Sequence, residues 1–288
     1  MAAGTSLFSA IAGIAGTIYE GAVYALRETV SIMPSVTVFG DVSGFAPRIG
    51  ELYGTVTFDS VAETVDLTPQ LFDPTNQQTL TPGEFGTQVM ISDRRLESDP
   101  QNYLSDVALE MGLAAADGID VALAQKFASF TGGTIGSAAG TVRWQDISAA
   151  KSLAKGLKVP GPYWCVLHPY QWKFLVNEAV TNGGVAGQIS PAISEQIMRQ
   201  YFVSSLFGDV TFIVSANVQI GTSGGTAGTA GFYNRQALAY DQRRGLRIEP
   251  FRDPSFRHTE LNATMAFATG VWLPARGITL LGTAPTPS

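Results

Sequence analysis

Residues 98–130, SDPQNYLSDVALEMGLAAADGIDVALAQKFASF, carry the longest helical pattern of the chain. Asp99 belongs to the residue types that cap helix N-termini, and Pro100 suits the first helical position. Apolar residues then recur mostly at steps of three and four, namely Tyr103, Val107, Met111, Ala114, Ile119, Leu123 and Phe127. A helix of about 30 residues would be about 45 Å long. We expect a structural spine, with Gly112 and Gly118 as points of bending or close packing.

Two extended segments precede this helix. Apolar and polar residues alternate over 52–67 and again over 83–96, and a Pro- and Gln-rich stretch, 68–82, separates them. Alternation is typical of strands, so we predict a long hairpin-like loop with a polar tip. Two strands alone are marginal in water. The loop must therefore lie against its own body or against a neighbouring copy.

The flanking regions predict further helices and strands. Residues 17–30 have the pattern of a short amphipathic arm, which Pro34 ends. We expect helices over 144–157, 169–180 and 190–207, and strands over 36–39, 163–169, 208–218, 231–242, 246–251, 256–269 and 277–282. Asp253-Pro254 predicts the turn between two of the long strands.

Composition excludes several classes of protein. The chain has 288 residues, and its 15% of charged residues lies below the roughly 25% of an average globular protein. Either little surface needs solvation or partners cover much of it. A single cysteine, Cys165, excludes an intrachain disulfide, and two histidines make a multi-histidine metal site improbable. A net charge of −6 argues against a protein whose main role is to grip nucleic acid.

Charge is distributed unevenly along the chain. Residues 1–130 contain 5 basic and 16 acidic residues, whereas 131–288 contain 13 basic and 8 acidic ones. The two halves are either solvated faces of one monomer or surfaces that attract one another between copies.

An arginine cluster stands out in the basic half. It consists of Arg235, Arg243, Arg244, Arg247, Arg252 and Arg257. Arginine favours bidentate contacts with carboxylates. Pairing across the strands of one sheet would explain the cluster. We prefer a second hypothesis, in which Arg243, Arg244, Arg247, Arg252 and Arg257 contact acidic loop residues of a neighbouring subunit, namely Asp59, Glu63, Asp66, Asp73 and Glu84.

Catalytic motifs are almost absent. Gly221-Thr222-Ser223-Gly224-Gly225 matches the nucleophile elbow of hydrolases, but a Gly- and Thr-rich loop follows instead of the required helix. Cys165 and His168 would point to opposite faces of one strand and cannot act as a pair. No phosphate-binding loop, dinucleotide fingerprint or zinc-protease motif occurs. We expect no enzymatic activity, no cofactor and no metal. The uncharged N-terminus, 1–19, is too rich in Gly and Ser to predict an export signal or a membrane span.

Three segments carry a resemblance to a known family. They are GAVYALRETVSIMPSV (21–36), LHPYQWKFL (167–175) and GFYNRQALAYDQRRGLRIEPFRDPSFRHTELNATMAFATGVWLPARGITLLG (231–282). With the order of elements, they resemble the major capsid proteins of tailed phages, of the Hong Kong 97 type. The resemblance implies an α+β fold with an N-terminal arm (1–44), an extended loop (45–90), a peripheral domain with the spine helix and a long hairpin (91–141, 244–269) and an axial domain (142–243, 270–288).

The resemblance also implies a function. Copies would form the hexamers and pentamers of an icosahedral shell, assembled in the host bacterial cytoplasm, around double-stranded DNA that is contacted non-specifically. A portal protein and a separate scaffolding or decoration protein would be further partners. Some members link the loop to a neighbour through a lysine, but the first lysine here is Lys126, so we expect no such crosslink. The alternatives are an encapsulin-like shell around cargo, a tail or minor virion protein, and a hydrolase based on Ser223.

Overall fold

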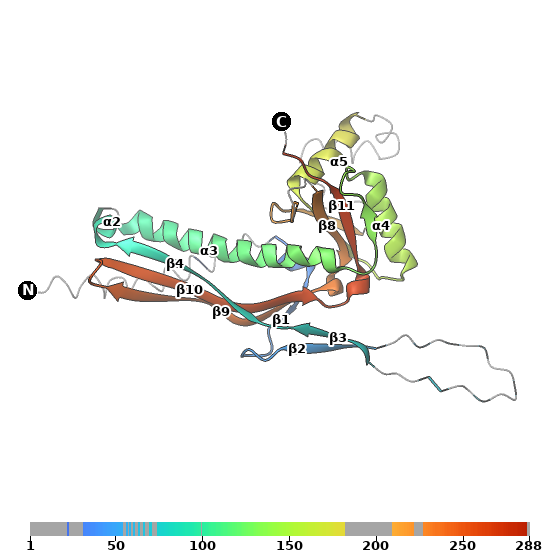
Figure 1. The fold of residues 1–288 in the computed structure, drawn as a ribbon, viewed down its shortest axis with the longest axis horizontal. Coiled ribbons are helices and arrows are strands. Elements are labelled where there is room, and N and C mark those ends of the chain that lie inside the picture. Colours follow the sequence, from blue (N-terminus) through green and yellow to red (C-terminus); the bar gives the residue numbers. More distant parts are fainter. Residues whose placement is uncertain are drawn as a thin grey trace, which may run out of the picture.

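The structure is a computed structural model. It describes residues 31–53, 74–98, 100–181, 209–221 and 227–286, together with Ala22 and single positions between 56 and 70. Figure 1 shows an elongated lobe, a compact lobe set across one of its ends, and a two-stranded hairpin, β2–β3, that leaves the body near the junction of the two. The predicted arm helix over 17–30 and the predicted helix over 190–207 fall outside the described residues, apart from Ala22.

The elongated lobe is a four-stranded sheet with helices along one face (Figure 1). Its elements are β1 (Thr37–Phe39), β4 (Gly83–Ser92), α2 (Asp93–Ser98), α3 (Pro100–Ala124), β9 (Leu238–Asp253) and β10 (His258–Val271). Strand β10 lies between β9 and β4 and is antiparallel to both. The turn between β9 and β10 contains Asp253-Pro254, as predicted. Together with α2, this turn forms the end of the lobe farthest from the compact lobe, which we call the tip.

Helix α3 owes its position to one apolar stripe. Val107, Met111, Ile119 and Leu123 recur in steps of four residues or multiples of four, and all are buried. A spacing of four keeps side chains on one side of a helix, and this side faces the sheet. The predicted helix over 98–130 is confirmed as α3 followed by the 3-10 helix η2 (Gln125–Ser129). Its predicted cap, Asp99, lies outside the described residues.

The compact lobe is a five-stranded sheet in the order β5-β11-β8-β6-β7. Its elements are β5 (Thr134–Gly136), α4 (Trp144–Gly156), β6 (Tyr163–Leu167), α5 (Pro169–Thr181), β7 (Val210–Val214), β8 (Ala227–Asn234) and β11 (Gly277–Thr283). Trp144 of α4 donates a hydrogen bond of 3.0 Å from Nε1 to the Leu175 carbonyl of α5. Both helices pack on the sheet face that contains Tyr163 and Phe212. The sequence predicted these two helices, and it missed the short strand β5.

Aromatic rings fill the junction between the lobes. Phe127, Phe130 and Tyr233, here called the aromatic joint, have ring centroids 5.6 to 6.0 Å apart. Phe127 is fully buried and packs on β8, where a Cβ on Gly231 would lie 2.8 Å from the Phe127 Cδ1. Glycine at that position is therefore required for the close approach of ring and strand. The same core cluster extends to Tyr240 and Phe267 of the elongated lobe, so one core spans both lobes.

The projecting hairpin differs from its prediction. Strand β2 (Arg48–Tyr53) pairs with β3 (Pro74–Leu80), which falls within the stretch predicted to be a polar tip. Residues 83–96, predicted to be the second arm of the loop, instead form β4 and most of α2. The prediction is wrong because alternation identifies a strand without identifying its partner, and β4 pairs with the distant strand β10.

Truncation of the aromatic joint should destabilise the fold. We expect Phe127→Ala to lower the free energy of unfolding by about 3–5 kcal/mol, because it removes a buried ring and leaves a cavity. Phe256→Ala is a matched control, since this side chain is 77% exposed. Chemical denaturation of the unassembled protein measures both. Equal effects of the two substitutions would contradict the role of the joint.

Candidate inter-subunit surfaces

Catalytic groups do not converge among the described residues. Cys165 is fully buried in β6, and desolvation raises the pKa of its thiol, so it is no nucleophile. His168 follows the strand, and burial lowers its pKa. Ser223 lies outside the described residues. No group of three or more metal-ligating side chains, and no helix with the length and apolar character to cross a membrane, occurs in the described part of the chain.

Four of the five arginines predicted to contact another subunit have an acidic partner within the chain. The pairs are Arg243–Asp241, Arg244–Glu84, Arg247–Glu249 and Arg252–Asp93. Arg244 and Glu84 were both predicted to lie at an interface, and the fold brings them together across the sheet. Outside this set, Arg235 donates a hydrogen bond to the Val36 carbonyl. Pairing within the sheet thus accounts for much of the cluster, and pairing between subunits stays a prediction.

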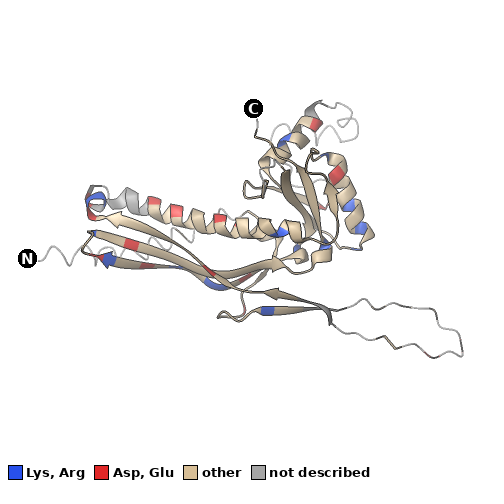
Figure 2. Ribbon diagram, viewed as in Figure 1, with Lys and Arg blue, Asp and Glu red and all other residues tan. Residues whose placement is uncertain are grey.

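Arg252 fastens the tip. Its Nη2 donates a hydrogen bond of 2.6 Å to Asp93 Oδ2, and its Nη1 bonds to the other carboxylate oxygen. This bidentate contact ties the first residue of α2 to β9, and it lowers the pKa of the Asp93 carboxyl. Arg257 lies in the turn between β9 and β10. Its backbone φ is 54°, and the residue is exposed. Figure 2 shows basic and acidic residues together at this end of the molecule.

A buried carboxylate holds the root of the β2–β3 hairpin. Asp241 of β9 accepts a hydrogen bond of 3.0 Å from Arg48 Nε of β2, and the same oxygen lies 2.7 Å from Arg243 Nη2. The Asp241 and Arg243 side chains are almost completely buried. Arg48 also pairs with the exposed Asp41. The hairpin therefore leaves the body at a site fixed by directional, charge-assisted hydrogen bonds.

The acidic residues of the loop beyond this hairpin are only partly described. Glu63 and Asp66 are exposed, whereas Asp59 and Asp73 lie outside the described residues. Two apolar side chains of the same loop are also open to solvent: Val56 is 61% exposed and Phe58 completely so. Exposed apolar side chains such as Val56 and Phe58 are typical of a surface that a partner covers.

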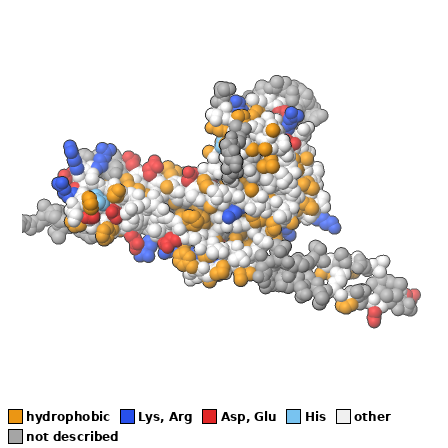
Figure 3. Space-filling model, in the orientation of Figure 1, with side chains coloured by type: hydrophobic (Ala, Val, Ile, Leu, Met, Phe, Trp, Pro, Cys, Tyr) orange, Lys and Arg blue, Asp and Glu red, His pale blue; other side chains and the backbone are white. Residues whose placement is uncertain are grey.

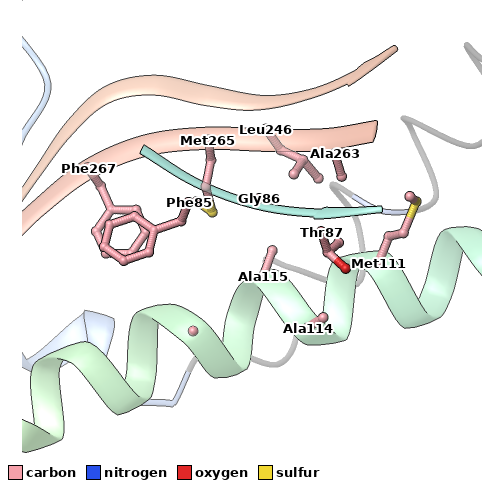
Figure 4. A pocket seen from close by; sticks show the side chains of 11 residues that line it. Phe85, Gly86, Thr87, Met111, Ala114, Ala115, Leu246, Ala263, Met265 and Phe267 are labelled. Carbon is pink, nitrogen blue, oxygen red and sulfur yellow. The ribbon is translucent and has the colours of Figure 1, made fainter. Parts of the chain in front are cut away.

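An apolar groove of about 210 Å³ lies between α3 and the sheet (Figure 4). Small residues and a few larger apolar ones line it: Phe85, Gly86, Thr87, Met111, Ala114, Ala115, Gly118, Leu246, Ala263, Met265 and Phe267. Phe85 and Phe267 stack with ring centroids 4.3 Å apart. Thr87 is the one polar side chain among the described residues that line the groove. The groove can therefore bind an apolar group, but this lining contains no acid, base or nucleophile suited to catalysis.

Sequence reasoning missed one residue of each of two ion pairs, Arg48 and Asp93. Arg48 lies 193 positions from Asp241, and Asp93 lies 159 positions from Arg252. No local pattern connects residues so far apart, so a single sequence gives no signal for either pair.

The comparison with family models decides what kind of protein this is. The model described as "Phage capsid protein" matches residues 76–280, more than two thirds of the chain. The chain belongs to the phage capsid protein family. It is therefore a structural, non-enzymatic shell protein, as the sequence predicted. The comparison with curated proteins finds no match for this capsid protein.

Solved structures share the fold of this capsid protein. The capsid of cyanophage P-SCSP1u has a TM-score of 0.63 at 18% identity, over 90% of this chain and 89% of the other. That of Helicobacter pylori bacteriophage KHP30 has a TM-score of 0.67 at 12% identity, over 88% and 92% of the two chains. A virus-like particle from Pyrococcus furiosus has a TM-score of 0.58 at 8% identity, over 91% and 97%. At such identities the likeness establishes the mixed α+β fold alone.

Loss of the buried carboxylate should destabilise this capsid protein. We expect Asp241→Ala to cost about 3–5 kcal/mol of unfolding free energy, because it leaves Arg243 as an uncompensated buried charge. Glu249→Ala breaks an exposed pair with Arg247 and should cost about 1 kcal/mol or less. Denaturant unfolding compares the two variants. If Asp241→Ala lowered the unfolding free energy no more than Glu249→Ala, this would contradict the role of Asp241 in compensating the buried charge of Arg243.

The Asp93–Arg252 pair should make stability depend on acid pH. The folded pKa of Asp93 lies below its ordinary value of 3.8, so the pair stabilises the fold above that value and loses this effect as the pH falls through the folded pKa. Wild-type protein should therefore exceed Asp93→Asn in thermal stability near neutral pH, and the difference should shrink in acid. Asp106→Asn, on the exposed side of α3, is the control. A difference that is constant with pH would contradict this prediction.

Proposed function

We propose that this chain is the major capsid protein of a tailed bacteriophage, whose copies form hexamers and pentamers of an icosahedral shell around double-stranded DNA. The observation that carries the proposal is the shape of the subunit. A hairpin fixed at its root projects from the body, and its loop exposes both apolar and acidic side chains. Such a loop is stabilised when it lies on a neighbour, which a repeating shell provides.

The parts of the chain suggest roles in that shell. The elongated lobe would be the peripheral domain (91–141, 244–269) and the compact lobe the axial domain (142–243, 270–288), with the arm (1–44) and loop (45–90) overlapping neighbours. The two lobes contain separate sheets, which supports this division, but β5 (Thr134–Gly136) belongs to the sheet of the compact lobe and not to that of the elongated lobe. Strand β4, however, lies in the sheet of the elongated lobe, so the proposed loop ends nearer residue 80.

A shell around another cargo is the second candidate. The virus-like particle from Pyrococcus furiosus shares the fold over 97% of its chain, so the architecture alone does not separate the two functions. The net charge of −6 fits a shell whose DNA contacts are weak and non-specific. The contents of native particles distinguish the candidates.

Electron microscopy of the purified chain and of native particles tests the proposal. We expect closed shells or capsomer rings, and nuclease-protected DNA inside native particles. A chain that stays monomeric at high concentration, alone and with a scaffolding protein, would refute the shell. Particles filled with protein cargo and free of DNA would favour the second candidate.

The same assay tests the loop contact. The double variant Glu63→Lys/Asp66→Lys should raise the concentration needed for assembly by about tenfold, equivalent to about 1.4 kcal/mol. Asp106→Lys/Glu110→Lys changes the charge equally on the exposed side of α3 and is the control. Equal assembly by wild type and the loop variant would remove the acidic loop residues from the interface.

A further inference from the structure

Strand β4 forms a free edge of the four-stranded sheet. It pairs with β10 on one side, over its whole length and without a bulge, and no described strand pairs with its other side. In an antiparallel pair, every second residue turns its N–H and C=O away from the partner strand. Proteins usually protect such an edge with lysine, proline or a bulge. Strand β4 has none of these, and its single charged residue, Glu84, is paired with Arg244.

The apolar groove between α3 and the sheet opens beside this edge (Figure 4). Its floor consists of buried side chains, namely Met111, Leu246, Ala263, Met265 and Phe267. The lining residues of β4 are exposed, as are the small residues Ala114 and Gly118 of α3, so these residues form the mouth. An apolar cavity of about 150 Å³ admits a molecule of the size of benzene, so the 210 Å³ of this groove can hold about one or two apolar side chains.

An edge strand with an apolar groove beside it is suited to an extended peptide. Such a peptide adds a strand to the sheet through main-chain hydrogen bonds, and its alternate side chains enter the groove. The α3 part of the lining runs from Met111 to Gly118, which is about 10 Å of helix. A strand advances about 3.3 Å per residue, so side chains at positions i and i+2 of the peptide fit this length.

Acidic side chains flank the groove along α3. Glu110 and Asp117 are exposed and, with Ala114, line an adjoining hollow of about 390 Å³. Asp117 accepts a hydrogen bond of 2.7 Å from Asn217, and no described lysine or arginine forms an ion pair with either carboxylate. Figures 2 and 3 show acidic side chains spaced along α3 with no basic ones between them. This side of the groove therefore attracts a basic segment.

The charge beside the groove favours a separate protein over a second copy of this chain. The loop beyond the β2–β3 hairpin has the required alternation, with Val56 and Phe58 exposed. Its described charged residues, Glu63 and Asp66, are however acidic and are repelled by this side of α3. Residues 1–19 and 277–288 contain no charge. Neither these two segments nor the loop supplies the basic side chains that the groove attracts.

We infer that β4 and α3 bind an extended segment of a separate protein, in which apolar residues alternate and lysine or arginine flanks them. The segment pairs with the free edge of β4, and its apolar side chains enter the groove beside Ala114 and Gly118. Its basic side chains lie near Glu110 and Asp117. This inference goes beyond the shell function, because it gives the subunit a partner other than its own copies, at a place apart from the hairpin.

Fluorescence anisotropy with synthetic peptides tests this site on the unassembled full-length chain. The probe is a labelled peptide in which valine alternates with threonine between terminal lysines. We expect it to bind about ten times or more as tightly as a peptide with glutamate in place of lysine, because the charge is reversed. We expect the same difference, about tenfold or more, from a peptide with a methylated backbone, which cannot donate main-chain hydrogen bonds. Binding of either altered peptide as tightly as the probe would overturn the inference.

Substitution at the mouth of the groove gives a matched pair of variants. Ala114→Trp fills the mouth and should weaken binding of the probe by about tenfold or more. Ala149→Trp, at an exposed position of α4, should bind the probe as the wild type does. Both should keep the wild-type unfolding midpoint, because both positions are exposed. Thr87→Lys, which places a positive charge at the same mouth, decides the question if the tryptophan at 114 lowers the midpoint. Equal affinities of the mouth variant and Ala149→Trp would refute the site.

A peptide from the loop of this chain tests the choice of partner. Residues 55–67, TVTFDSVAETVDL, should compete with the probe about ten times less well or worse, because their charges are acidic. Competition equal to that of the unlabelled probe would assign the groove to a second copy and overturn the inference. Peptide binding is measured without assembly. A chain that forms shells but binds no probe would therefore refute the inference alone, and a chain that binds the probe but forms no shells would refute the shell function alone.

Discussion

The packing of Phe127 and Phe130 against Tyr233 is the contact on which the rest of the structure depends. The five-stranded and four-stranded sheets share no strand, so neither sheet's hydrogen bonds fix the other's orientation. Three rings in mutual contact, in a core that includes Tyr240 and Phe267, provide that link. Dense packing of large rigid side chains allows few arrangements. The angle between the lobes is therefore set by side-chain shape, and with it the position of every surface that a neighbour meets.

Polar contacts complement this core at its edges. Asp120 of α3 accepts hydrogen bonds of 3.0 and 3.1 Å from the backbone amides of Ser31 and Ile32, which fastens the segment before β1 to the helix. Asp241 fastens β2 to β9 by accepting a hydrogen bond from the Arg48 side chain. Segments that leave the body are thus held by hydrogen bonds whose geometry is specific, while the body itself is held by apolar packing.

Local signals in the sequence predicted the local structure. The spacing of apolar residues from Tyr103 to Phe127 predicted α3, and Asp253-Pro254 predicted the turn at the tip, because each depends on neighbours in the chain. The partner of β4 could not be predicted, since pairing of Met90 with Glu260 depends on residues far apart in the sequence. The arginine cluster was visible as composition, but the pairing of Arg252 with Asp93 was not, nor was that of Arg48 with Asp241. The alternation around Met90 could not reveal which side of β4 faces α3.

The position of Cys165 has a consequence for any particle built from this chain. It is the single thiol of the sequence and has no surface in contact with solvent. No disulfide can form within a subunit, and none can form between subunits while the fold is intact. This chain can therefore pass from a reducing to an oxidising environment without making or breaking a disulfide, so its noncovalent contacts are the same in both.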